Sequence, residues 1–102
     1  MADASVERAI EDALQIVKTS WTQGASARDA DGSACSALSQ GAVKYCANGA
    51  LVRAAHRNGV SAERLFACVV AVAPDFVRIN DGPDGQRWVI AFFEEALENP
   101  RA

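Results

Sequence analysis

The sequence predicts an all-α fold in which about four helices form one small bundle. Three observations support this prediction: apolar side chains recur every third or fourth position along four stretches, Ala is frequent, and only three Pro residues are present. A chain of 102 residues has room for a single hydrophobic core. We therefore expect one helical domain over residues 1–102.

The first helix is predicted over residues 5–19, with Ser5 or Asp3 as its cap. Its charged residues fall mostly on the side opposite the apolar face. The apolar face is expected to consist of Val6, Ile10, Ala13, Leu14, Val17 and Trp21.

The segment 22–42 is different in composition, because Gly, Ser, Asp and Ala dominate it and large apolar side chains are nearly absent. The tract Arg28–Gly32 is typical of a turn, since Asp bonds its own backbone and Gly accepts positive φ. We expect a long irregular segment here, or one that contains a hairpin. A loop of this length in a small domain is often functional or mobile.

A second helix is predicted over 43–57 and a third over 61–73, separated by the stop signal Asn58-Gly59. Ser61 is the expected cap of the third helix. Because that helix is apolar nearly all round, we expect it at the centre of the domain.

The last helix is predicted over 86–97, with Asp84 as its cap, after a segment rich in turn-forming residues. This helix has a strong apolar face. Its members are Trp88, Val89, Phe92, Phe93, Ala96 and Leu97.

Composition limits the classes of function. The net charge is −3, from 10 Lys and Arg against 13 Asp and Glu, which provides no overall attraction to nucleic acid or to an anionic membrane. The longest apolar run, Leu65–Pro74, is far shorter than the ~20 residues of a membrane span, and no export signal is evident. We expect a cytoplasmic protein whose three cysteines are reduced thiols.

Four short motifs occur along the chain: W-x-Q-G at 21–24, D-x-x-G at 29–32, C-A-x-G-A-L at 46–51 and N-D at 80–81. Together they resemble a family of unknown function found in bacterial and phage proteins. Members of the family often have Trp before the Asn-Asp pair, where this chain has Ile79, so no role for an aromatic ring is implied there. The resemblance spans about residues 10–97 and implies a shape without an assigned activity.

Polar side chains in two loops form the candidate binding site. Loops held by a rigid scaffold commonly carry binding residues, and a pocket floored by Trp21 would form if segments 22–32 and 79–85 meet. The candidate ligand- or partner-binding residues are Trp21, Gln23, Arg28, Asp29, Asn80 and Asp81.

A structural interpretation of the same residues stands beside the functional one. In it, Asn80 and Asp81 cap the last helix or shape a turn, Arg28 and Asp29 form a local ion pair, and Trp21 belongs to the core.

No catalytic, metal or cofactor site is predicted. Cys46 opens a helix, and a thiol there can become reactive. However, His56 lies ten residues further along the same helix, about 15 Å away at about 1.5 Å per residue, so a Cys–His pair is excluded and a buried, inert thiol is expected. Zinc binding is not expected either, because no two of Cys35, Cys46, His56 and Cys68 have the close spacing of a structural site.

The leading functional hypothesis is a non-enzymatic protein-interaction or regulatory domain that binds an unknown protein or itself. The first alternative is a DNA-binding regulator, because segment 51–70 resembles a helix-turn-helix. Its second helix offers only Glu63 and Arg64 as polar groups for base edges, so nucleic acid is not the expected partner. The second alternative is small-molecule binding at the 21–29 and 80–81 loops.

Overall fold

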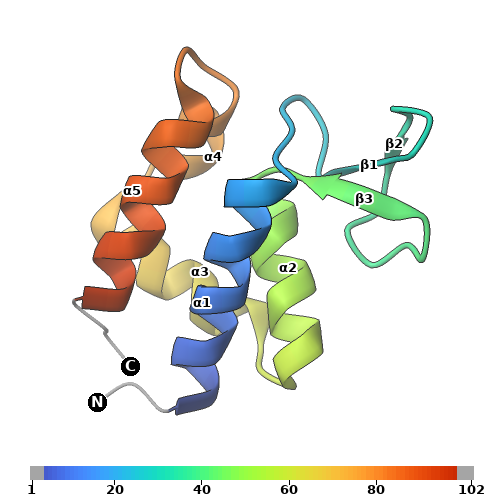
Figure 1. Ribbon diagram of the computed structural model, residues 1–102. Coiled ribbons are helices and arrows are strands. Elements are labelled where there is room, and N and C mark those ends of the chain that lie inside the picture. The colour runs from blue at the N-terminus through green and yellow to red at the C-terminus, as the bar shows by residue number, and fades with distance from the viewer. Residues whose placement is uncertain (1–3, 99–102) are drawn as a thin grey trace.

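The computed structural model describes residues 4–98, which form a helical domain with a small sheet at one side (Figure 1). The prediction of a mostly helical fold is confirmed, whereas a purely all-α fold is wrong. The described residues contain five helices and three strands. In order they are α1 (Ala4–Thr19), β1 (Ala27–Asp29), β2 (Ala34–Cys35), β3 (Ala42–Tyr45), α2 (Ala47–Asn58), α3 (Ala62–Val72), α4 (Phe76–Asn80) and α5 (Gly85–Glu98).

Helix α1 lies at the centre of the helical layer and packs against both α2 and α5 (Figure 1). Ser5 belongs to the body of this helix and so does not cap it, and Asp3 lies outside the described residues. The face that α1 buries repeats with helical spacing. It consists of Val6, Ala9, Ile10, Ala13, Leu14, Ile16 and Val17.

The prediction that the third helix lies at the centre is wrong. Helix α3 buries Leu65, Cys68 and Val69, while Val70 remains 43% exposed. Because α3 packs at the edge of the bundle against α2 and α5, only one of its faces is covered. Apolar residues on every side of α3 therefore did not mean that every side is buried.

The expected hairpin in segment 22–42 is confirmed, and it is part of an antiparallel sheet with strand order β2-β1-β3. Its turn is closed by Asp29, whose Oδ1 accepts hydrogen bonds from the backbone N of Asp31 and Ser33, both at 3.0 Å. Gly32 completes the turn with a φ of 84°.

The predicted start of the second helix at residue 43 is wrong, because residues 42–45 form strand β3. Tyr45 pairs with Ala27 and Lys44 pairs with Arg28, and the β-branched and aromatic side chains of Val43 and Tyr45 suit a strand. Helix α2 begins only after Cys46, whose Sγ accepts a hydrogen bond from Gly49 N at 3.3 Å.

The predicted signals between the second and third helices are confirmed. Gly59 ends α2 in the left-handed conformation with a φ of 65°, and its N–H bonds the carbonyl oxygens of Ala55 and His56. Ser61 caps α3 by accepting a hydrogen bond from Glu63 N at 3.2 Å. The turn between the two helices thus follows from local sequence alone.

The corner between α3 and α5 contains the short helix α4, which the sequence did not predict. Asp84 does not act as the expected side-chain cap of α5. It adopts a left-handed conformation with a φ of 56°, and its carbonyl oxygen accepts a hydrogen bond from Trp88 N at 3.1 Å. Gly85 then packs so closely on Asn80 that a Cβ atom would overlap the Asn80 carbonyl group.

Substituting Gly49→Ala should destabilise the fold by about 2–3 kcal/mol, because the new Cβ would overlap the carbonyl oxygen of Ser26 on the loop that precedes β1. Gly41→Ala is the matched control, since its Cβ would have only ordinary contacts with Ser39 and Asp29. Urea denaturation followed by circular dichroism measures both variants. Equal losses of stability would contradict the close approach at Gly49.

Candidate functional site

The side chain of Asn80 joins three parts of the chain at one buried point. Asn80 is 1% exposed, and its Oδ1 accepts hydrogen bonds from Trp21 Nε1 at 2.8 Å and from Ala47 N at 3.0 Å. Its Nδ2 donates to the carbonyl oxygen of Thr22 at 3.2 Å and to Asp81 Oδ1 at 3.1 Å. The amide thereby uses two donors and two acceptor positions, which is its full capacity.

Neighbouring side chains reinforce the same contact between the two loops. Gln23 Nε2 donates to the carbonyl oxygens of Asn80 and Gly82, both at 3.0 Å. Gly24, with a φ of 79°, donates its N–H to Asp81 Oδ1 at 3.0 Å. We call this cluster of Trp21, Gln23, Asn80 and Asp81 the Asn80 junction.

Arg28 extends the junction, whereas Asp29 does not. The Arg28 guanidinium donates to Thr22 Oγ1 at 3.1 Å and to the carbonyl oxygens of Gln23 and Gly32, both at 3.0 Å. The Asp29 carboxylate instead accepts hydrogen bonds from the backbone of its own hairpin turn. Among the described residues, Arg28 and Asp29 therefore do not form the local ion pair that the structural interpretation expects. The structure therefore brings five of the six candidate residues together and separates Asp29 from them.

Asn80 bonds the start of a helix, as the structural interpretation expects, but that helix is α2 and not the last one. Instead of capping the last helix, Asn80 bonds the first N–H group of α2, one residue after the Cys46 cap. Trp21 is half-buried rather than part of the innermost core, and it reaches Asn80 with its indole N–H. The polar groups of the junction are thus mainly occupied with one another, and a ligand-binding role for them stays a prediction.

A polar hollow of about 410 Å³ lies beside the junction, where the sequence places a pocket floored by Trp21. Its wall is formed by Trp21, Gln23 and the segment 82–87. A smaller hollow of about 220 Å³ on another side of the junction is lined in part by Cys46, Val77 and Asp81.

The thiol of Cys46 is buried at the N-terminus of α2. Burial raises the pKa of the Cys46 thiol, the Asp81 carboxylate raises that pKa further, and hydrogen bonds from the backbone of Gly49 and Asn48 lower it. The net pKa lies above the ordinary value, which keeps the thiol protonated and weakly nucleophilic. His56, near the other end of α2, is exposed.

An apolar hollow between α4 and α5 was not predicted from the sequence. Trp88 is 49% exposed and stacks on Phe92, with ring centroids 6.2 Å apart and an interplanar angle of 28°. The hollow has a volume of about 350 Å³. Its lining residues are Arg78, Ile79, Gly82, Pro83, Trp88 and Phe92.

The prediction that Trp88 shares the buried face of the last helix is wrong. Val89, Phe93 and Ala96 follow the buried stripe of α5, and Trp88 lies about 100° around the helix from Val89. The signal was present in the sequence, since Glu95 continues the same stripe as Trp88 and Phe92 and shows that this side of the helix approaches solvent.

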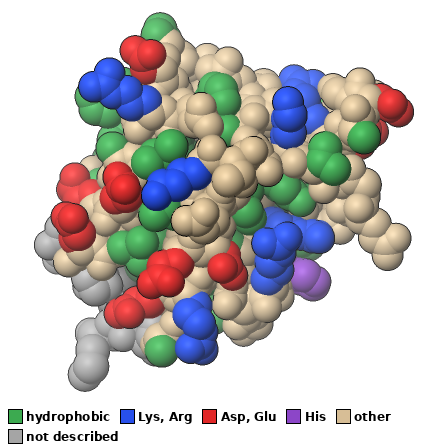
Figure 2. Space-filling view, viewed as in Figure 1, with side chains coloured by type: hydrophobic (Ala, Val, Ile, Leu, Met, Phe, Trp, Pro, Cys, Tyr) green, Lys and Arg blue, Asp and Glu red, His purple; other side chains and the backbone are tan. Residues whose placement is uncertain are grey.

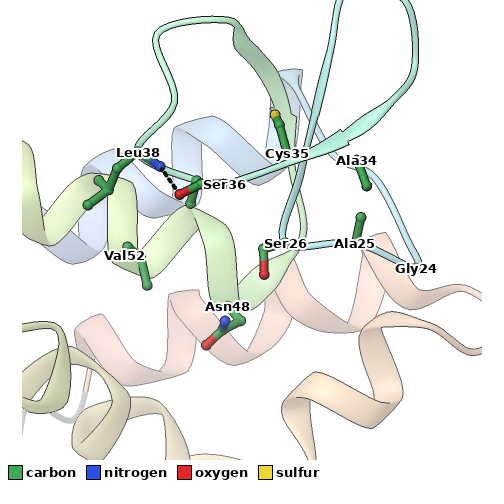
Figure 3. Close-up of a pocket in the computed structure, with 10 residues that line it drawn as sticks. Gly24, Ala25, Ser26, Ala34, Cys35, Ser36, Leu38, Asn48 and Val52 are labelled. Carbon is green, nitrogen blue, oxygen red and sulfur yellow. Dashed lines mark hydrogen bonds between the residues drawn. The ribbon is translucent and has the colours of Figure 1, made fainter.

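A fourth hollow of about 400 Å³ lies between β2 and α2 (Figure 3). Apart from Asn48, its lining side chains are small or apolar, including Cys35, Leu38 and Val52. A hydrogen bond of 3.2 Å joins Leu38 N to Ser36 Oγ. This surface offers few groups for catalysis or for recognition of a charged ligand.

Charge is unevenly distributed over the surface. Residues 34–62 contain Lys44, Arg53 and Arg57 but no Asp or Glu. In Figure 2, basic side chains lie over α2, and acidic side chains gather over α5 and the lower half of α1. The exposed face of α3 would have to contact DNA bases in the helix-turn-helix hypothesis. It presents Glu63 and Arg64 in the first turn and then Ala67, Val70 and Ala71.

Within residues 4–98, no group of three or more His, Cys, Asp and Glu side chains could hold a metal ion. Over the same residues, each helix is too short or too polar to cross a membrane.

The fold and the junction together define a small helical domain with a hydrogen-bonded loop corner. A family model described as "Family of unknown function (DUF6197)" matches residues 1–100, and the chain belongs to that family. No curated protein and no solved structure matches the chain.

Replacing Asn80 by Ala should lower the free energy of unfolding by about 3–4 kcal/mol, because the N–H groups of Trp21 and Ala47 lose their buried acceptor. Asn58→Ala is the matched control. Asn58 Nδ2 bonds Asp12 and the carbonyl oxygen of Ala54 at a half-buried site, and its loss should cost about 1 kcal/mol. Urea titrations compare the two, and a loss at Asn80 no larger than at Asn58 would refute the central role of the junction.

The Cys46 thiol should react slowly with a soluble disulfide reagent at about pH 8, whereas the half-buried Cys35 should react first.

Because the folded-state pKa of Cys46 is raised, the unfolded chain loses this proton first as the pH rises above the ordinary value of 9.0. Stability should therefore fall as the pH rises above about 9, and Cys46→Ser should reduce that fall. Mass spectrometry of labelled peptides measures the order of reaction, and preferential labelling of Cys46 would contradict the first expectation. Urea midpoints measured against pH test the second expectation.

Proposed function

We propose that this protein is a non-enzymatic protein-interaction domain, and that its partner binds at the apolar hollow between α4 and α5. The observation that carries this proposal is the half-exposed indole of Trp88, stacked on Phe92 in a hollow of about 350 Å³. Trp is the residue type most enriched at the energetic centres of protein interfaces.

The burial of apolar surface favours the binding of a partner over this hollow. A Trp side chain buries about 150–250 Å² when fully enclosed, so about half of that area still faces water at Trp88. At about 25 cal/mol per Å², covering the remainder would contribute about 2–3 kcal/mol to binding. Ile79, Pro83 and Phe92 add rigid apolar walls around the indole.

The chemistry of the described residues supports a binding role over catalysis. The Cys46 thiol is buried and held protonated, and the hydrogen-bonding groups of the Asn80 junction are mainly used within the fold. The junction instead fixes the corner 80–85 from which α5 starts, so it positions Trp88.

The same proposal places the protein in the cytoplasm, in bacteria or their phages, as a single domain with reduced thiols. The cytoplasmic part of this proposal is supported by the three cysteines, none of which is in a disulfide in the described part of the chain. Self-association through the same hollow is the alternative within this class.

Two alternatives have less support. A DNA-binding role for segment 51–70 has Arg53, Arg57 and Arg64 as sources of phosphate contacts, but the exposed face of α3 is apolar beyond its first turn. A small molecule would have the polar hollow beside Trp21 and Gln23, whose hydrogen-bonding groups are already engaged.

Selection of random peptides on the immobilised domain tests the proposal. Peptides that bind the wild type should lose at least tenfold in affinity to Trp88→Ala, and they should shift backbone amide resonances of residues 78–92. Val43→Ala is the matched control, because Val43 is 47% exposed on β3, away from α4 and α5. Peptides that bind all three proteins equally, or a selection that returns none, would refute the proposal.

A further inference from the structure

We infer that the partner segment carries a large apolar side chain with a carboxylate beside it, the carboxylate being recognised by Arg78. This inference rests on the proposed function and specifies the chemistry of its partner. It follows from the presence of one arginine among the residues that line the apolar hollow.

Arg78 is the one charged residue among those that line the hollow. The other five lining residues are Ile79, Gly82, Pro83, Trp88 and Phe92, which present apolar surface. An apolar side chain that enters the hollow therefore brings its neighbouring groups close to a positive charge. A carboxylate is the group that pairs best with a guanidinium, because two of its oxygens match the planar donor geometry.

The guanidinium of Arg78 is available for such a pair. Its side chain is 77% exposed, and its Nη2 donates to Asp75 Oδ2 at 3.1 Å. This contact joins two exposed side chains three residues apart on the surface, a kind of pair that contributes little to stability. Since a guanidinium has five N–H donors, a second carboxylate can bind without displacing Asp75.

The polar hollow adjoins the apolar one, because Gly82 and Pro83 line both. An extended segment anchored at Trp88 can therefore continue over this turn toward Gln23 and Gln86. Arg87 lines that second hollow together with the acidic side chain of Asp84, whereas no acidic residue is among those that line the apolar hollow. Selection for a carboxylate is thus assigned to Arg78 and not to Arg87.

The experiment uses the full chain and four labelled eight-residue peptides measured by fluorescence anisotropy. One contains Phe-Glu at its centre, a second Phe-Gln, a third Ala-Glu, and the fourth ends in Phe with a free C-terminal carboxylate. The wild type should bind Phe-Glu at least fivefold more tightly than Phe-Gln or Ala-Glu. Preference for the fourth peptide over its C-terminal amide would identify a chain end as the source of the carboxylate.

Variants assign the preference to its residue. Arg78→Gln should abolish the preference for Glu over Gln while binding to Phe-Gln is kept, and Arg57→Gln on α2 should leave the preference unchanged. Asp75→Asn should increase the preference about twofold or more, because it removes the negative charge that partly neutralises the Arg78 guanidinium. If Arg78 had only a structural role, Arg78→Gln would not lower the preference for Glu while Asp75→Asn raises it.

The outcomes separate this inference from the proposed function. Equal binding of Phe-Glu and Phe-Gln, together with equal binding of the fourth peptide and its C-terminal amide, would overturn the carboxylate inference. If this binding still depends on Trp88, the interaction domain stays in place. A dimer that is lost in Trp88→Ala, without peptide binding, would assign the hollow to a second copy and overturn the inference. Failure of all peptides, including those selected on the wild type, would overturn both.

Discussion

The buried amide of Asn80 is the constraint on which the rest of the structure depends. Its four hydrogen bonds connect the end of α1, through Trp21 and Thr22, to the start of α2 and to the corner before α5. A polar side chain that is 1% exposed is tolerated in an apolar core only when its donors and acceptors are paired. Since the partners are spread over 59 residues of chain, the amide fixes long-range geometry that hydrophobic packing alone would leave loose.

The junction also explains why two glycines lie where they do. A Cβ at Gly49 would overlap the Ser26 carbonyl, and a Cβ at Gly85 would overlap the Asn80 carbonyl, so backbone segments meet here without intervening side chains. This close packing starts α2 and α5 at defined positions. It leaves Trp88 directed into the hollow at the far side of the corner, which connects the scaffold to the proposed binding surface.

The candidate site was predictable in part. Gln23, Asn80 and Asp81 were identifiable because polar and turn-forming residues were concentrated in two loops, and the loops do meet. The partners of those residues were not predictable, since the choice between a ligand and the backbone of a distant helix depends on three-dimensional position. Asp29 shows the opposite case: its turn is local, and the sequence was sufficient to expect it.

The sequence by itself determined the elements whose causes are local: the amphipathic α1, the Gly59 stop, the Ser61 cap and the Asp29–Gly32 turn. Helical periodicity and capping involve neighbours a few residues apart, so a single sequence contains the necessary information. Only the tertiary structure decided that residues 42–45 form a strand and that α3 lies at the edge. Each of these depends on which distant segment covers a given face, because hydrophobic side chains indicate that burial is favourable without specifying the partner that supplies it.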